Sequence, residues 1–474
     1  MRILIAIAIL ASLASANTGN SSAFDAAYEE LSTVIERDVC IIGGGSSGMH
    51  AAVSLHDLKK SVVVVERNNY LGGHAHTYVD PETYRTVELG VIIWLPLPEV
   101  IEFFTKFKEP LINISFTTGG NVPGQPANLS LPAVLYRFIP EYFDFRDDYT
   151  YLLTGDELPS PVPADLYLPF GEFLNKHSIQ PVIPELYQAE QGLGSLLDVL
   201  TIYVAKYFNL YDIRILEGAS SYLTAGNGNL SQLFSRAGDY IGSSNILLQS
   251  SVIATKRENT RSGRPEVLVS TEGSGLKTLV CKQILSTIPP TLDNLKGWDL
   301  SDAERKVFSQ FTRSSGYWTG LVTNVGLNQS IGCTNAAVNT SFNIPVLPGL
   351  YDLNPVGVLN DVWSAFFGSD DPTMTDDQVK VYAVQQIQEL QKATKVPVTE
   401  PKWLIFESLS PYQLQVSPEA VEAGFFTNLD NLQGGFHNTM FYTGAAFHTH
   451  YSSLLWRFNK NVIIPRMLNS HRTG

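Results

Sequence analysis

The sequence predicts an α/β protein whose parallel sheet is built from several separate stretches of the chain. Residues 39–42 and 62–65 are apolar runs, rich in Val and Ile, of the kind found in strands buried on both faces of a sheet. The helical pattern between them completes one right-handed strand–helix–strand unit. Further strand-like runs follow at 246–256, 266–270 and 278–288, separated by turns that contain Gly or charged residues.

The turn after the first strand has the sequence GGGSSG at residues 43–48. Gly43 allows the tight turn, Gly45 lets the backbone approach a pyrophosphate, and Gly48 lets the next helix pack close to the sheet. The N-terminus of that helix favours a bound diphosphate. The second strand ends on Glu66, where a carboxylate accepts the hydroxyl hydrogens of a ribose. These features together predict a dinucleotide-binding unit.

The rest of the chain is less regular. Residues 111–165 are rich in Pro, Tyr and Phe, and we expect them to belong to a lobe that faces the substrate. Helical segments follow through residues 171–207. Residues 377–392 predict a helix with an apolar stripe, and Thr375 with Gln378 forms its capping box.

Composition excludes several classes of protein. The formal net charge of −14 argues against a nucleic-acid partner, because phosphate binding needs a basic surface. After the N-terminus, no apolar stretch approaches the roughly 20 residues that a membrane span requires. No Cys or His spacing is typical of a metal site, so we expect no metal.

The N-terminus is typical of a secretory signal peptide, with Arg2, an apolar run at 3–13 and Ala-Ser-Ala at 14–16. We therefore expect residues 1–16 to be removed and the mature protein, beginning near Asn17, to be secreted or to reside in the secretory lumen. The alternative is an uncleaved helix that anchors the protein in a membrane. Asn-x-Ser/Thr acceptors predict N-glycosylation, and they lie at Asn20, Asn113, Asn128, Asn229, Asn328 and Asn339.

The sequence contains three cysteines, Cys40, Cys281 and Cys333. Cys40 and Cys281 lie in strand-like apolar runs, so we expect buried free thiols rather than a disulfide.

The residues after Glu66 indicate which dinucleotide is bound. A Gly-Gly pair six residues after Glu66 resembles the extended FAD fingerprint of the flavin-dependent amine oxidase superfamily. Residues 87–90, VELG, resemble the next flavin-side segment of that superfamily, and residues 441–444, FYTG, resemble its last flavin-contacting strand and turn. Within it, the run GGHAHTY at 72–78 and the secretory start look most like fungal β-cyclopiazonate dehydrogenase-type oxidoreductases. Bacterial flavin-dependent polyunsaturated fatty acid isomerases are a more distant likeness.

The resemblance implies a Rossmann-like FAD-binding fold of the glutathione reductase and amine oxidase type, with a discontinuous cofactor domain and an inserted α+β substrate domain. The cofactor domain would comprise residues 33–110, 215–298 and 400–474, and the substrate domain residues 111–214 and 299–399. FAD is the implied cofactor. The implied cofactor-binding residues are Gly43, Gly45, Gly48, Glu66, Gly72, Gly73, His74, Gly90, Val252 and Gly444. The implied substrate-pocket residues are Tyr317, Trp318, His450 and Tyr451.

Several positions differ from the superfamily pattern. His74 stands where many amine oxidases have Arg, and Ala446 stands where an acidic residue is usual. Residues 315–320 cover the position of the flavin-side lysine without supplying a Lys. These differences argue against ordinary amine oxidation. His74 and His76 are either hydrogen-bonding residues near the pyrophosphate or candidates for a covalent bond to the flavin.

The expected function is an FAD-dependent dehydrogenase or oxidase that removes a hydride from a bulky secondary metabolite of small-molecule size. The electron acceptor, oxygen or another compound, stays open, and no residue is assigned as catalytic acid or base. The alternatives are a flavin-dependent isomerase of an unsaturated, lipid-like substrate, an amine oxidase, and a flavin carrier without activity.

Overall fold

A computed structural model describes residues 33–114 and 151–469, except for short gaps at 156–157, 181–182, 184–185, 188–189, 217, 259, 261 and 338–339. The predicted signal peptide lies outside these described residues. So do the glycosylation acceptors Asn20, Asn128 and Asn339.

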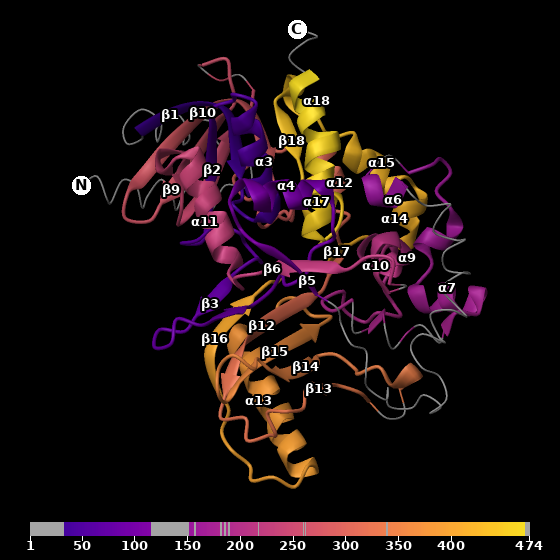
Figure 1. Ribbon diagram of the computed structural model, residues 1–474. Coiled ribbons are helices and arrows are strands. Elements are labelled where there is room, and N and C mark those ends of the chain that lie inside the picture. The colour runs from indigo at the N-terminus through magenta and orange to yellow at the C-terminus, as the bar shows by residue number, and fades with distance from the viewer. Residues whose placement is uncertain are drawn as a thin grey trace.

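The first sheet carries the predicted strand–helix–strand unit and draws its strands from three separate parts of the chain (Figure 1). At its centre, β1 runs parallel to β2 on one side and to β10 on the other. β10 also pairs in parallel with β18, near the C-terminus. The strands are β1 (Thr33–Ile42), β2 (Val62–Val65), β7 (Ile246–Leu247), β8 (Ser250–Lys256), β9 (Glu266–Thr271), β10 (Gly275–Ser286) and β18 (Met440–Tyr442). The chain therefore builds a discontinuous α/β domain, as the sequence predicts.

Helices from distant parts of the chain pack together on this sheet. α3 (Ser46–Asp57) is the crossover between β1 and β2, and it contacts both α11 (Leu230–Ile241) and α17 (Ser452–Phe458). Figure 1 shows these three helices beside the sheet. Trp456 of α17 donates from its indole N–H to the Ser46 carbonyl over 3.1 Å, which ties the C-terminal segment to the start of α3.

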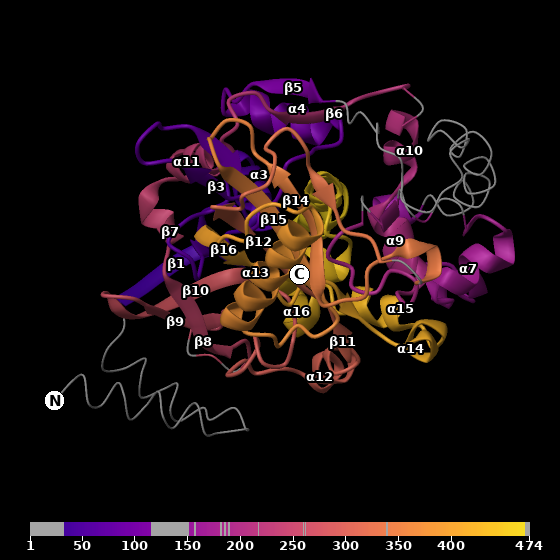
Figure 2. The same ribbon diagram turned by 90° about the horizontal axis from the view of Figure 1, so that it is seen from below.

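The second sheet has the strand order β13-β14-β15-β12-β16 and is antiparallel throughout. Helix α13 (Asp376–Ala393) packs on one face, with Val379, Ala383 and Ile387 buried against it, and Figure 2 shows the helix lying across the strands. The predicted capping box of Thr375 and Gln378 is confirmed. The strands are β12 (Gly316–Thr323), β13 (Cys333–Thr334), β14 (Gly349–Pro355), β15 (Val362–Ser369) and β16 (Lys402–Ser408).

Smaller elements complete the two lobes. The two-stranded sheets are β3 (Thr77–Val79) with β4 (Thr86–Glu88), β5 (Leu111–Ile114) with β6 (Tyr222–Ala225), and β11 (Arg313–Ser314) with β17 (Leu414–Gln415). The remaining α-helices of the described residues are α4 (Pro98–Lys106), α6 (Tyr151–Thr154), α7 (Phe170–His177), α9 (Thr201–Tyr207), α10 (Leu210–Leu216), α12 (Asp302–Phe308), α14 (Pro418–Glu422), α15 (Phe425–Asp430), α16 (Gly435–Asn438) and α18 (Ile464–Asn469).

Two expectations need correction. The expected start of the last cofactor-domain segment at residue 400 is too early, because β16 pairs with β12 and so belongs to the second sheet.

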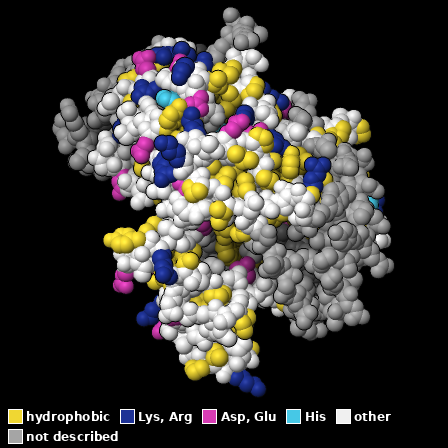
Figure 3. Space-filling model, in the orientation of Figure 1, with side chains coloured by type: hydrophobic (Ala, Val, Ile, Leu, Met, Phe, Trp, Pro, Cys, Tyr) yellow, Lys and Arg dark blue, Asp and Glu magenta, His cyan; other side chains and the backbone are white. Residues whose placement is uncertain are grey.

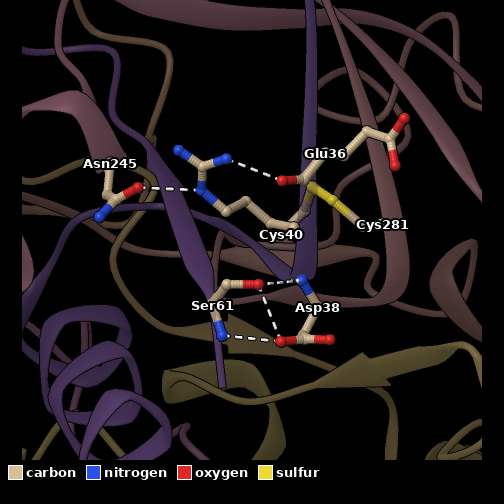
Figure 4. Close-up of a disulfide and its surroundings, with 7 residues drawn as sticks. Glu36, Asp38, Cys40, Ser61, Asn245 and Cys281 are labelled. Atoms are coloured by element: carbon tan, nitrogen blue, oxygen red, sulfur yellow. Dashed lines mark hydrogen bonds between the residues drawn. A yellow bond between two sulfur atoms is a disulfide. The ribbon is translucent and has the colours of Figure 1, made fainter. Parts of the chain in front are cut away.

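Cys40 and Cys281 are fully buried, as expected, but they form a disulfide instead of remaining free thiols (Figure 4). Neighbouring parallel strands bring their Cα atoms to 5.8 Å, within the range that a disulfide bridges. The two cysteines are 241 residues apart in sequence, so no local pattern indicated that they lie close together.

Candidate active site

The N-terminus of α3 forms an open cradle. Gly45 caps the helix without a side-chain hydrogen bond, and the first turn has no acidic residue. The first N–H groups of a helix have no acceptor within it, so they can bind an anion there. Gly43 has a φ of +107°, and a Cβ on Gly48 would lie 2.0 Å from the Gly43 carbonyl oxygen. Both positions therefore require glycine.

A second glycine loop faces this helix end. A Cβ on Gly73 would lie 3.0 Å from the Cα of Gly45, whereas a Cβ on Gly45 would meet nothing closer than 3.9 Å. Gly45, Gly72 and Gly73 all line the cavity at this helix end, where a bound pyrophosphate would lie against them. Glu66 closes the end of β2, and its carboxylate accepts hydrogen bonds from the backbone N–H of Gly44 (2.7 Å) and of Asn68 (2.8 Å). These residues fit the diphosphate and ribose of a dinucleotide.

A single cavity of about 570 Å³ runs from this cradle to a wall of aromatic side chains. Most of the predicted site residues line it: Gly45, Gly72, Gly73, His74, Gly90, Tyr317, Gly444, His450 and Tyr451. Gly43, Gly48 and Glu66 lie behind the lining, where they shape the cradle. Val252 lies on β8, two residues after Ser250, whose N–H donates to the Glu66 carbonyl; its contact with the adenine side stays a prediction.

His74, Tyr412 and His450 form a group of stacked rings on the cavity wall. The rings of Tyr412 and His450 are 3.9 Å apart between centroids, and the His74 and His450 rings are nearly parallel at 6.4 Å. Burial lowers the pKa of His74 to about 4 and that of His450 to about 3. Both imidazoles are therefore neutral at neutral pH, and each has one donor and one acceptor nitrogen.

Tyr317 connects the cavity to polar groups behind it. Its hydroxyl donates to Oε1 of Gln191 over 3.1 Å, and Nε2 of Gln191 donates to Asp352 over 2.7 Å. Burial raises the pKa of Asp352 to about 6. The phenols of Tyr207 and Tyr412 share a hydrogen bond of 3.3 Å beside this chain.

Asp212 organises another part of the wall. Its Oδ1 accepts from the hydroxyls of Tyr222 (2.9 Å) and Tyr451 (3.1 Å), and its Oδ2 accepts from the N–H of Asn209 (2.8 Å). Glu190, also buried, lines the same cavity. Sequence reasoning missed Asp212, Glu190 and Tyr412 because they have no local motif; the only sequence signal was the abundance of tyrosine.

Trp318 does not line the cavity, so its assignment as a pocket residue was wrong. Side chains alternate between the two faces of a strand. On β12, Tyr317 therefore faces the cavity and Trp318 faces the opposite side, where it packs under α13 and is only 1% exposed. The run of aromatic residues did not indicate which of the two faces the cavity.

His76 also lies outside the cavity lining. Its Nδ1 is 2.9 Å from a carboxylate oxygen of Glu407, its ring stacks on Tyr70 at 3.9 Å, and the Tyr70 hydroxyl donates to the same carboxylate over 3.1 Å. Of the two histidines considered for a covalent flavin bond, His74 is thus the one at the cavity. The covalent bond itself stays a prediction.

Charge at the cavity is unevenly distributed. Among the described lining residues, Arg67 is the only Lys or Arg, and it lies next to Glu66 at the dinucleotide end. Ala446 lines the cavity at the position where the superfamily pattern has an acid. The described residues contain no cluster of three or more His, Cys, Asp or Glu side chains placed to hold a metal ion.

Two observations concern the charge of the surface and the apolar character of the helices. On the face shown in Figure 3, Lys and Arg side chains are interspersed with Asp and Glu. None of the helices in the described part of the chain has the length and apolar character needed to cross a membrane.

The glycine cradle, the Glu that follows β2 and the discontinuous sheet define a dinucleotide-binding protein with the architecture of flavin-dependent amine oxidases. Residues 41–107 match the family model of an NAD(P)-binding Rossmann-like domain. The chain is 35% identical over 450 residues to the FAD-dependent oxidoreductase oblC of Cochliobolus heterostrophus, covering 92% of both chains. It is 30% identical over 449 residues to β-cyclopiazonate dehydrogenase of Aspergillus oryzae, covering 90% of this chain and 92% of that one. The protein belongs to this family of fungal FAD-dependent oxidoreductases, and FAD is its cofactor.

Solved structures agree on the fold. A fatty acid isomerase from P. acnes that produces CLA superposes with a TM-score of 0.68 at 16% identity, covering 90% of this chain and 98% of that one. A putrescine oxidase variant superposes with a TM-score of 0.59 at 13% identity, covering 92% and 100%. Identities this low show the architecture alone. The predictions of fold, family, cofactor and enzyme class are confirmed.

Proposed function

We propose that this oxidoreductase removes a hydride from a C–H bond of a bulky, partly aromatic or polyene secondary metabolite. Bound FAD supplies the hydride acceptor. The observation that carries the proposal is the continuity of the cavity, because one cavity contains both the dinucleotide cradle and the aromatic wall. A substrate held by that wall shares the space with the cofactor.

The residues of the wall position the substrate and exclude water. Tyr317 and Tyr412 meet edge to face with their rings 5.0 Å apart, and Tyr207 approaches Tyr451 at 6.1 Å. Flat rings of this kind orient an apolar skeleton by shape, and orientation contributes much of the rate in such reactions. The neutral imidazoles of His74 and His450 add polar contacts without adding charge.

The relatives favour a substrate of the same general class. One of them is named for the dehydrogenation of β-cyclopiazonate, and the others are named as FAD-dependent oxidoreductases. The absence of Lys from residues 315–320, together with Ala446, favours a reaction other than ordinary amine oxidation.

Simple primary amines are expected to be poor substrates. Mixed anaerobically with the holoenzyme, benzylamine should leave the yellow flavin spectrum unchanged, whereas a bulky aromatic or polyene substrate should bleach it. Stopped-flow absorbance over a compound library measures this directly. Rapid turnover of benzylamine would instead indicate an ordinary amine oxidase.

The fold of the fatty acid isomerase keeps a second reaction open, in which the hydride returns to the substrate. The two reactions differ in their balance of electrons. Oxidation consumes one equivalent of an electron acceptor per product, whereas isomerisation consumes none. Acceptor consumption measured beside product formation separates the two.

We also propose that the protein matures in the secretory pathway, with residues 1–16 removed. Supporting this, disulfides such as Cys40–Cys281 persist in oxidising compartments. Asn113 is exposed on β5, and Asn328 is also exposed. Asn229 caps α11 by accepting a hydrogen bond from the N–H of Gln232, so its side chain is already engaged.

Protein from a eukaryotic host is therefore expected to begin near Asn17 and to carry glycan on Asn113, with Asn229 bare. Peptide mass spectrometry before and after glycosidase treatment checks both points, and Asn113→Gln is the control for site assignment. An intact Met1 and a chain without glycan would contradict this proposal.

A further inference from the structure

A single carboxylate of the second sheet contacts both ends of the second glycine loop. Oε1 of Glu407, on β16, lies 2.9 Å from Nδ1 of His76, and its Oε2 accepts a hydrogen bond of 3.1 Å from the Tyr70 hydroxyl. The rings of Tyr70 and His76 also stack on each other, with 3.9 Å between their centroids and 9° between their planes. Figure 1 shows β3, which begins directly after His76, beside β16. One side chain of the second lobe therefore closes residues 71–75 into a loop.

This loop carries three of the residues that line the cavity. Gly72, Gly73 and His74 all lie between Tyr70 and His76 in the sequence. The backbone N–H of Gly72 also donates over 2.9 Å to a carbonyl of the first glycine loop. The position of these cavity-lining residues against the cradle therefore depends on how the two ends of their loop are held.

Glu407 acts as an ionised double acceptor. Burial raises the pKa of its carboxyl group, but the hydrogen bond and charge of His76 and the hydrogen bond of Tyr70 outweigh burial and lower the pKa below its usual value. An ionised carboxylate has no hydrogen to donate, so His76 and Tyr70 both donate to it. An amide of the same shape has one acceptor oxygen and cannot serve both donors.

A neighbouring side chain holds the other flavin-side segment. Thr319 of β12 lies directly opposite Glu407 in the pairing of β12 with β16. Thr319 is only 2% exposed, and its hydroxyl donates over 2.5 Å to the carbonyl of Leu89. Leu89 precedes Gly90, which lines the cavity. We call Glu407 and Thr319 the cross-strand pair.

We propose that the cross-strand pair consists of positioning residues for FAD, which hold residues 72–74 and Gly90 at the cavity from the second lobe. Tyr317 lies two residues before Thr319 on β12 and lines the cavity from the same face of the strand. The pair thus also fixes the aromatic wall relative to the bound cofactor, and the rate of such a reaction depends on that orientation. The proposal concerns FAD alone and does not depend on which substrate is oxidised.

Glu407→Gln and Thr319→Val test the proposal, because each removes hydrogen bonds of the pair with little change of shape. Apoprotein from riboflavin-starved cells is titrated with FAD. Each variant should need about tenfold more FAD than the wild type for half-saturation, an effect typical of coupled contacts. The visible circular dichroism of the FAD that does bind should also change, because this signal reports the surroundings of the flavin ring.

Two matched controls make the same chemical changes elsewhere in the second lobe. Glu389→Gln neutralises an exposed carboxylate on α13. Thr323→Val removes a hydroxyl that donates to the Lys402 carbonyl, within the second sheet. Both controls should keep the wild-type affinity for FAD and the wild-type dichroism.

His76→Asn and Tyr70→Phe separate positioning from a general loss of stability. If Glu407 acts through His76, the double variant Glu407→Gln/His76→Asn should need no more FAD than Glu407→Gln alone. Tyr70→Phe keeps the stacked ring and loses one hydrogen bond, so it should remain folded and raise the half-saturating FAD concentration by a smaller factor. The melting temperature of each apoprotein shows whether it is folded.

Folded Glu407→Gln and Thr319→Val proteins that bind FAD with wild-type affinity and dichroism would overturn the proposal, even if they melt at a lower temperature. Additive losses of affinity in the double variant would overturn it as well, because Glu407 would then not act through His76. If Glu407→Gln does not fold, Tyr70→Phe decides the matter, and wild-type affinity in that variant would count against the proposal.

Discussion

Gly45→Val is expected to give a folded but colourless protein. A Cβ at this position meets no atom closer than 3.9 Å, and the backbone has an ordinary φ of −68°, so the chain itself accepts a side chain there. The branched side chain, however, occupies the space between the two glycine loops, where the backbone must approach the pyrophosphate of FAD. Flavin absorbance after purification, and again after incubation with excess FAD, measures the loss.

Gly48→Ala is the matched control, because it alters the same motif in a different way. A Cβ there would lie 2.0 Å from the carbonyl oxygen of Gly43, so α3 cannot keep its place against the turn. This variant should lose thermal stability as well as FAD, whereas Gly45→Val should lose only FAD. A Gly45→Val protein that stays fully yellow would contradict the assignment of the cradle. A colourless wild-type protein that cannot be reconstituted would contradict it as well.

Trp318→Ala is expected to lower the free energy of unfolding by about 3–5 kcal/mol, the usual cost of truncating a large buried aromatic side chain. Trp318 is 1% exposed and packs beside Phe367, edge to face at 6.1 Å, in the core that α13 covers. The residue therefore stabilises the second lobe and does not touch the substrate. Unfolding in urea, followed by tryptophan fluorescence and by circular dichroism, measures the change.

Tyr317→Phe is the control on the neighbouring position. It keeps the ring at the cavity wall and removes only the hydroxyl that donates to Gln191, so its effect on stability should be much smaller. A Trp318→Ala variant as stable as the wild type, with turnover reduced and FAD retained, would restore Trp318 to the substrate pocket.

The sequence by itself determined the cofactor unit, since the features that bind a dinucleotide are local. The tight turn, the close approach of backbone and the open helix N-terminus need particular residues at fixed short spacings, and residues 43–48 and Glu66 supply them. The same holds for α13, whose capping box and apolar stripe are complete within one segment. FAD and the discontinuous fold followed from the resemblance of such short segments, and the comparisons confirmed both.

Only the tertiary structure decided how distant residues meet. The pairing of β1 with β10 places Cys40 and Cys281 on neighbouring strands, where they form a disulfide, and the pairing of β16 with β12 extends the second sheet beyond the expected boundary. The cavity brings together α10, β6 and other segments far apart in sequence, so no short pattern could reveal Asp212 or Glu190. Likewise, alternation along a strand places Tyr317 and Trp318 on opposite faces, and which face lines the cavity depends on what packs against the sheet. A local pattern determines the geometry of a turn or a cap, whereas the composition of a cavity depends on the packing of the whole chain.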